Sequence, residues 1–216
     1  MTVSITFYDR DNGLSKTQRA AFEDQAKGTV EAISARLPMP DIDVLILTTV
    51  NYSRGVYSFT GHTISPHVTM FFVDPGIDTL ADYVTAFFPA LLAHELHHCL
   101  RWPYFSKTIG EAIILEGMAL RAERDLGFER RALGQAPDQA QMQAMFDKAQ
   151  SEIDAPHDGS WIYSAPGGDG WSWIYHLGEY VVDLAFEAEG WDVFSQIDTP
   201  APEIFAAAGR ARSLKD

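Results

Sequence analysis

Hydrophobic and polar residues alternate over residues 3–8, with the period of two that is typical of a β-strand with one buried face. Short apolar or alternating runs predict three further strands, at residues 43–49, 56–60 and 67–73. Gly61 and Pro66 separate the last two runs, and both residue types commonly interrupt strands. The pattern therefore predicts a small mixed sheet in the N-terminal half of the chain.

Apolar residues recur with helical spacing in two segments of the same half. The first covers about residues 15–36, where two prolines end it. The second opens at Thr79, which is predicted to form a capping box with Asp82, and it stops before Pro103. Pro89 lies inside this second helix and is expected to kink or restart it.

The second half of the chain is predicted to be mainly helical. Helices are expected at about residues 108–127, 138–153, 171–189 and 202–210. The segment from Asp154 to Gly170 is rich in glycine, proline, aspartate and aromatic residues, and its length makes it a candidate lid. A sheet followed by helices predicts an α+β fold.

The helix before Pro103 carries the most informative motif, His94-Glu95-Leu96-His97-His98. Residues four apart lie one turn apart on one helix face, so the imidazoles of His94 and His98 can bind one zinc ion. Glu95 then lies beside the ion, where a carboxylate can activate a water molecule. His97 is also one turn from His94 and stays open as a ligand, although the HExxH spacing favours His98.

Two carboxylates lie on the helix expected after residue 108. Glu111 follows Thr108 by three residues, so a capping box explains it. Glu116 lies mid-helix, and its same-face neighbours are all apolar: Ala112, Ile113, Ala119 and Leu120. A carboxylate buried there needs a partner, and a divalent cation can replace its lost hydration. Two histidines and one glutamate leave the fourth tetrahedral position for water, as in catalytic zinc sites.

These residues resemble the gluzincin class of zinc metallopeptidases, in which HExxH on one helix is joined by a glutamate on the next. More narrowly, the chain resembles a bacterial family of predicted zinc-dependent proteases of unknown function. In that family HExxH is followed by a Glu-Gly-Leu-Ala-like helix and a late Tyr-x-x-Gly segment, here residues 94–98, 116–119 and 175–178. The glycine expected before the late tyrosine is Ile174. The resemblance implies one zinc ion per chain with His94, His98 and Glu116 as ligands, and Glu95 as general base.

The resemblance also implies a single zincin-like domain with two lobes. Residues 1–102 would form an α/β lobe that carries the HExxH helix, and residues 103–216 a mainly helical lobe. Zinc would lie at the floor of the cleft between them. We expect residues 67–73 to be the edge strand above the metal, where main-chain hydrogen bonds can align a peptide.

Three other residues are candidates for smaller roles, and Cys99 is not one of them. Tyr175 and His176 on the late helix are candidates for stabilising the oxyanion of a tetrahedral intermediate, although a solvated charged face also explains His176. Glu123 lies one heptad after Glu116, where it either orients a ligand histidine or pairs with a neighbouring arginine. Cys99 is interpreted as a small buried hydrophobe with no role in the site.

Composition narrows the possible partners and location. The chain has 216 residues, of which 46% are hydrophobic, enough for a sizeable core in one domain. Its formal net charge of -14 at pH 7 disfavours nucleic acid and anionic membranes, because phosphate groups would be repelled. No secretion signal is evident and no apolar run reaches the length of a membrane span, so we expect a cytoplasmic protein. One cysteine permits no internal disulfide.

We therefore predict a zinc peptidase that hydrolyses peptide or protein substrates with a zinc-activated water and Glu95 as general base. A second hypothesis is a zinc-stabilised binding protein or pseudoenzyme, in which the same ligands hold the fold. That hypothesis has no use for Glu95, so the presence of this residue favours the enzyme. A third interpretation, in which the histidines only pack in a core, requires another buried partner for Glu116.

Overall fold

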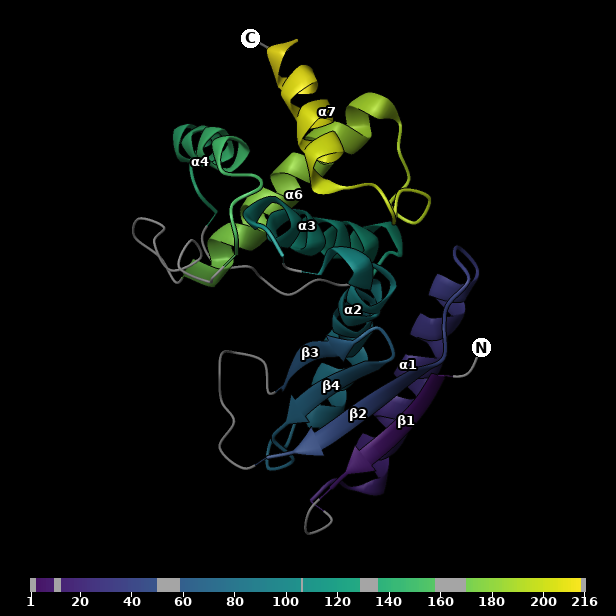
Figure 1. Cartoon of the computed structure of the whole chain (residues 1–216). Coiled ribbons are helices and arrows are strands. Elements are labelled where there is room, and N and C mark those ends of the chain that lie inside the picture. The colour runs from purple at the N-terminus through teal and green to yellow at the C-terminus, as the bar shows by residue number, and fades with distance from the viewer. Residues whose placement is uncertain are drawn as a thin grey trace. The chain divides into compact units, whose positions relative to one another are not determined.

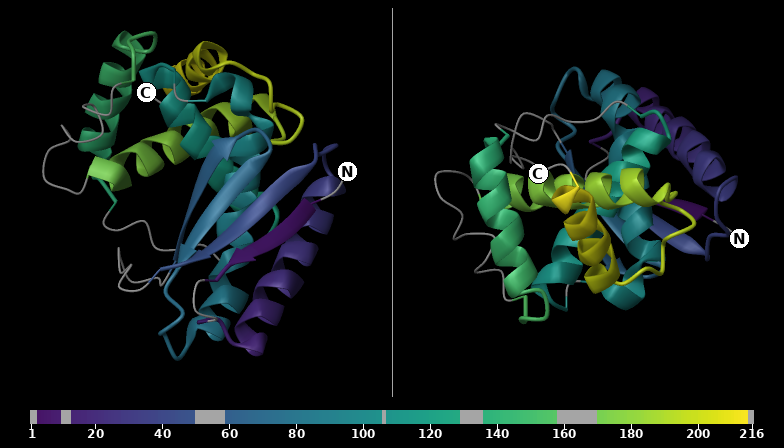
Figure 2. Two further views of the ribbon diagram at one scale, coloured as in Figure 1. Left: turned by 60° about the horizontal axis from the view of Figure 1, so that its bottom comes forward. Right: turned by 90° about the horizontal axis from the view of Figure 1, so that it is seen from above.

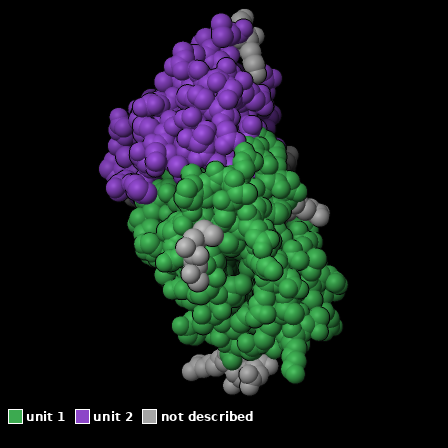
Figure 3. Space-filling model, turned by 90° about the vertical axis from the view of Figure 1, so that its right-hand side faces the viewer, with its two compact units in different colours: residues 1–102, 123–131 green, residues 103–122, 132–216 purple. Residues whose placement is uncertain are grey.

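The computed structural model describes residues 3–9, 13–49, 59–105, 107–128, 136–157 and 170–214. They contain one small mixed sheet and a series of helices (Figure 1), which confirms the predicted α+β class. The chain divides into two compact units, coloured separately in Figure 3: Met1–Trp102 with Glu123–Arg131, and Pro103–Ala122 with Ala132–Asp216. The grouping of the chain into two lobes of one zincin-like domain stays a prediction.

The first unit is built on a four-stranded sheet with the order β1-β2-β4-β3. β1 (Val3–Tyr8), β2 (Ile42–Thr48) and β4 (Val68–Val73) run parallel to their neighbours, whereas β3 (Phe59–Ser65) pairs with β4 in the antiparallel direction. The strands predicted at residues 3–8, 43–49 and 67–73 are confirmed, with shifts of one residue at the ends of the last two. The mixed character of the sheet is confirmed as well.

The predicted edge strand is wrong. β4 lies between β2 and β3, so the edge on this side of the sheet is β3. The apolar sequence of β4 suits a strand with neighbours on both sides, while the more polar β3 suits an edge. Gly61, predicted to lie between two strands, instead lies inside β3 opposite Phe71. Of the strand predicted at residues 56–60, only the last two residues lie in the described part of the chain, and both belong to β3.

Helices α1 (Lys16–Ser34) and α2 (Leu80–Leu100) pack together against one face of this sheet (Figure 2). Alternate residues of β2 and β4 point into the core that they cover: Ile42, Val44, Ile46, Phe71 and Val73. Phe88 of α2 contacts Phe22 of α1 and Phe71 of β4 edge to face, with ring centroids 4.8 and 5.0 Å apart. These apolar contacts fix α2, which carries the HExxH motif, against the sheet.

The helix starts of the first unit agree only in part with the sequence patterns. Ser15 caps α1 through a capping box with Gln18. Thr79 precedes α2, but its side chain makes no capping hydrogen bond, so the predicted box with Asp82 is wrong. A residue whose side chain caps a helix ordinarily has an extended backbone, whereas Thr79 has φ −93° and ψ 13°. α2 continues through Pro89 as one helix and does not restart there.

The second unit is helical in its described part. The 3-10 helix η2 (Trp102–Tyr104) precedes the helices α3 (Ile109–Asp125), α4 (Gln139–Ser151), α6 (Gly170–Glu189) and α7 (Ala201–Ser213). The four helices predicted here are confirmed, with shifts at their ends. Gly127 and Gly190 follow α3 and α6 with φ of 75° and 64°, the left-handed conformation that ends a helix. The candidate lid falls mostly on residues 158–169, outside the described residues.

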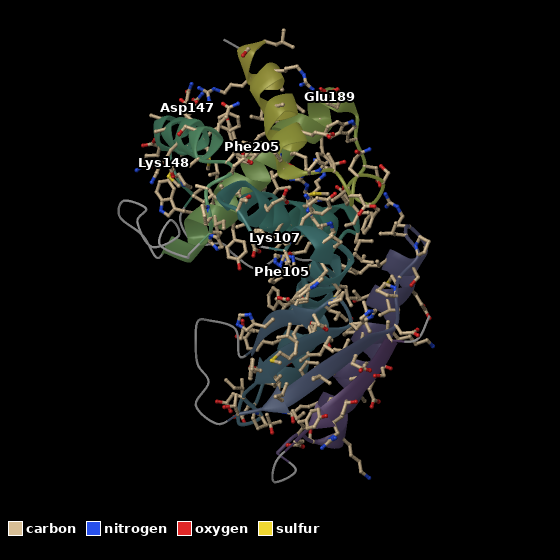
Figure 4. The ribbon with its side chains drawn as sticks, viewed as in Figure 1. Phe105, Lys107, Asp147, Lys148, Glu189 and Phe205 are labelled. Atoms are coloured by element: carbon tan, nitrogen blue, oxygen red, sulfur yellow. The ribbon has the colours of Figure 1, made fainter. Side chains whose placement is uncertain are left out.

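Charged side chains join α7 to two other helices of the second unit, and Figure 4 labels the two carboxylates involved, Asp147 of α4 and Glu189 of α6. Arg212 of α7 pairs with Asp147 of α4 at 2.6 Å, and this hydrogen bond with Arg212 lowers the pKa of the Asp147 carboxyl. Arg210 pairs with Glu189 at the end of α6, also at 2.6 Å. Among the described helices of the whole chain, none is both long and apolar enough to cross a membrane.

Candidate metal centre

The HExxH motif lies in the most deeply buried part of α2. Every residue from Phe88 to Cys99 is buried, including His94, Glu95 and His98, which are 4–5% exposed. A helix buried on all sides is ordinarily apolar, because burying imidazole and carboxylate groups without partners is costly. These buried polar side chains are therefore expected to have hydrogen-bonding, ionic or metal partners.

His94 has a carboxylate partner on one of its two ring nitrogens. Nδ1 lies 2.7 Å from Oε1 of Glu123, which is itself only 6% exposed. A carboxylate at Nδ1 favours the tautomer that carries its proton there, which leaves the lone pair of Nε2 available to a metal. The expected role of Glu123 in orienting a histidine of the motif is thus matched by a direct contact.

The three predicted metal ligands have candidate ligand atoms that lie close to one another. His94, His98 and Glu116 each offer one ligand atom, and these atoms lie within 4.8 Å of one another. α3 is one continuous helix that carries both Glu116 and Glu123, so one helix face supplies a ligand and the partner of His94 Nδ1. Among the described residues, the group that can hold an ion does not include His97, the alternative that the sequence left open.

The chemistry of this donor set fits zinc. Two imidazole nitrogens and one carboxylate oxygen are common ligands of Zn²⁺, and three protein ligands leave a fourth position for water. Zinc bonds of about 2.1 Å in a tetrahedral arrangement place ligand atoms about 3.4 Å apart. The three candidate ligand atoms lie within 4.8 Å of one another, which is the range expected of groups that can share one ion.

Glu95 lies against β3. The Oγ1 hydroxyl of Thr63 is 2.8 Å from Oε2 of Glu95 and 2.8 Å from its main-chain oxygen. A Cβ atom at Gly61 would lie 2.7 Å from Cγ and 2.8 Å from Oε1 of Glu95, so only glycine leaves room for this side chain. The sequence pattern did not indicate that Gly61 or Thr63 belongs to the site. Their spacing of two places them on one strand face, but that signal appears only once β3 is assigned correctly.

Cys99 is the buried hydrophobe that the sequence predicted. It is 2% exposed, and its Sγ lies 3.6 Å from the main-chain oxygen of Ser65. Burial raises the pKa of the thiol to about 12. Cys99 is therefore a neutral, weakly hydrogen-bonding group.

Tyr175 and His176, the predicted oxyanion donors, lie half-buried on α6 in the second unit. Gly178, three residues after Tyr175, packs against α3 at Gly117. A Cβ atom at Gly178 would lie 2.5 Å from the Ile113 carbonyl oxygen. The late Tyr-x-x-Gly segment is therefore held next to the helix that carries Glu116. The contact of Tyr175 and His176 with a reacting group stays a prediction.

Glu111 has a different partner from the one predicted. Thr108 Oγ1 does accept a hydrogen bond from the Glu111 amide, at 3.2 Å, which is half of a capping box. The Glu111 carboxylate, however, accepts a hydrogen bond at 3.0 Å from the amide of Ala201, the first residue of α7. It supports the start of a distant helix, which the local spacing could not indicate.

The family model described as predicted Zn-dependent protease (DUF2268) matches residues 22–206. The match covers most of the chain and includes every residue of the candidate metal centre. The chain belongs to this family. Membership confirms the resemblance to zinc-dependent proteases of unknown function, and the family description supports zinc and proteolysis in general terms. No curated protein matches the sequence.

Proposed function

We propose that the chain is a zinc-dependent peptidase whose single zinc ion is held by His94, His98 and Glu116. One observation carries the proposal: three suitable ligand atoms lie together on two helices, with Glu123 at the Nδ1 atom of one ligand. The pattern of a carboxylate behind a ligand histidine is common in zinc enzymes. Membership of a family described as predicted Zn-dependent protease supports the same interpretation, that the site binds zinc.

The proposed mechanism is hydrolysis by water. When bound, zinc would supply Lewis acidity that polarises the scissile carbonyl and lowers the pKa of water at the open position. Glu95 accepts the proton of the attacking water at its carboxylate and donates it to the amide nitrogen that leaves. Its burial and its hydrogen bond with Thr63 support this role, because they fix the position of the carboxylate on the motif helix.

Two further parts of the proposal concern the substrate. β3 is the edge strand that contacts α2 at Glu95, so a peptide added to this edge would run beside the general base. Tyr175, and less strongly His176, are proposed to donate hydrogen bonds to the carbonyl oxygen as negative charge develops on it. The family match includes the Tyr-x-x-Gly segment that contains both residues.

The test is Glu95→Gln, which keeps the shape of the side chain but removes the base. Hydrolysis of a fluorescence-quenched peptide mixture should fall by about 10²–10⁴-fold while zinc content stays at that of the parent. Glu23→Gln, at an exposed position of α1, is the matched control and should change neither quantity. Undiminished hydrolysis by Glu95→Gln would refute the mechanism. A parent that binds zinc without cleaving any peptide of the mixture would favour the non-catalytic zinc protein.

A further inference from the structure

Glu95 is held by the edge strand as well as by its own helix. We infer that Thr63 is a positioning residue for Glu95, with Gly61 providing the space that the carboxylate side chain occupies. The inference rests on the proposed function, since it assigns Thr63 to the general base of that reaction. It adds a third element, β3, to a site whose predicted residues lie on α2 and α3.

Gly61 confines the Glu95 side chain from one side. A Cβ atom at this position would lie 2.8 Å from Cε1 of Phe71 as well as 2.7 Å from Cγ of Glu95. Phe71 is fully buried in the core between the sheet and α2, so its ring cannot move aside without opening a cavity. The side chain of Glu95 therefore lies over the bare Cα of Gly61, and any larger residue there would displace it.

Thr63 fixes the end of the same side chain. Thr63 is 8% exposed, and its hydroxyl lies 2.8 Å from Oε2 of Glu95 and 2.8 Å from the Glu95 main-chain oxygen. A hydroxyl has one hydrogen to donate and can also accept. It can donate to the carboxylate before proton transfer. It can accept from the carboxylic acid afterwards, while its own hydrogen turns to the main-chain oxygen.

The pleat of β3 explains why these two residues act together. Residues two apart on a strand share a face, so Gly61 and Thr63 both lie toward α2. His62 between them lies on the other face, where its ring meets the ring of Phe72 at a centroid distance of 6.5 Å. A register irregularity follows directly, between Thr63 and Ser65. The regular part of the strand thus extends as far as the contact with Glu95.

Thr63→Val tests the inference, because valine has nearly the same shape and no hydroxyl. With a quenched peptide that the parent cleaves, kcat should fall by about 10–100-fold, KM should stay within about 2-fold, and zinc content should not change. Thr63→Ser restores the hydroxyl and should recover kcat to within about 3-fold. Thr69→Val is the matched control, because this buried threonine bonds to the His62 oxygen instead of Glu95. Parent-like kcat in Thr63→Val would overturn the inference.

A second measurement needs no activity. In zinc-loaded protein, Thr63→Val should lower the thermal unfolding midpoint by about 2–6 °C when Glu95 is present, because a buried carboxylate loses a hydrogen bond. In the Glu95→Ala background the same substitution should have much less effect. Equal shifts in both backgrounds would mean that Thr63 serves only the main-chain oxygen, which overturns the inference. This cycle still decides the role of Thr63 if the parent hydrolyses no peptide, an outcome that counts against the proposed function alone.

Discussion

At the scale of single residues, the two ring nitrogens of His94 would have separate tasks in the proposed centre. Nδ1 is 2.7 Å from the Glu123 carboxylate, so Nε2 is the nitrogen that we propose for the metal. In that role Glu123 would fix the tautomer and the ring orientation and make His94 a more basic ligand. The effect of this residue should appear in metal affinity before it appears anywhere else.

Glu123→Gln should weaken zinc binding by roughly 10–100-fold, because an amide is a neutral and weaker acceptor for the Nδ1 hydrogen. The measurement is a competition titration of zinc against a chromogenic chelator. Asp125→Asn makes the same acid-to-amide change at an exposed position of the same helix and should leave the affinity unchanged. Equal affinities of Glu123→Gln and the parent would show that the contact is structural only.

Local spacing explains which site residues the sequence could predict. His94 and His98 are four apart on one helix, so their common face follows from helix geometry. Thr63 lies 32 positions from Glu95, and its contact depends on the pairing of β3 with β4, which no local pattern specifies. Glu111 shows the same limit, because its carboxylate bonds to an amide 90 positions away.

At the scale of elements, the crossing of α3 and α6 has no room for side chains at its centre. A Cβ atom at Gly178 would lie 2.5 Å from the Ile113 oxygen and 2.7 Å from the Gly117 nitrogen, and these backbone atoms cannot rotate away. Gly117 belongs to the segment 116–119 and Gly178 to the segment 175–178, the two segments that carry the family resemblance together with the HExxH motif. Their contact therefore sets the spacing between the helices that carry those two segments.

Gly178→Ala should destabilise the protein by about 1–3 kcal/mol, because overpacking outweighs the better helix propensity of alanine. Gly28→Ala is the matched control in α1, where a Cβ atom would meet nothing within 4 Å. There the same change should stabilise by up to about 1 kcal/mol. Denaturant unfolding followed by circular dichroism measures both. A Gly178→Ala variant as stable as Gly28→Ala would contradict the close crossing.

Whether a segment is a helix or a strand was easier to predict than which other elements lie beside it. The period of two in residues 3–8 and the helical spacing of the later segments are local properties, and those elements are present. The predicted edge strand was wrong, because strand order in a sheet is not a local property of the sequence. Gly61 also suggested a break between strands, whereas it lies inside β3 and leaves room for the side chain of Glu95. Pro89 does not restart the helix, since α2 runs through it as one element, and a kink there stays a prediction.

At the scale of the whole molecule, the proposed function depends on a metal ion. Two histidines and one glutamate in buried or half-buried positions on α2 and α3 form a donor set that one divalent ion can share. The family to which the chain belongs is described as predicted Zn-dependent protease, and the donor set agrees with that description. Glu116 is the decisive member, because the two histidines alone make only half of a tetrahedral site.

The most direct test is the metal content of purified protein by inductively coupled plasma mass spectrometry, after reconstitution with zinc and removal of excess. The parent and Glu95→Gln should each hold about one zinc per chain, because three protein ligands complete the site without Glu95. Glu116→Ala should lose most of it, while Glu111→Ala, a glutamate of the same helix bonded to α7, should keep it. A parent that holds no zinc, or a Glu116→Ala variant that holds as much as the parent, would contradict the proposed centre.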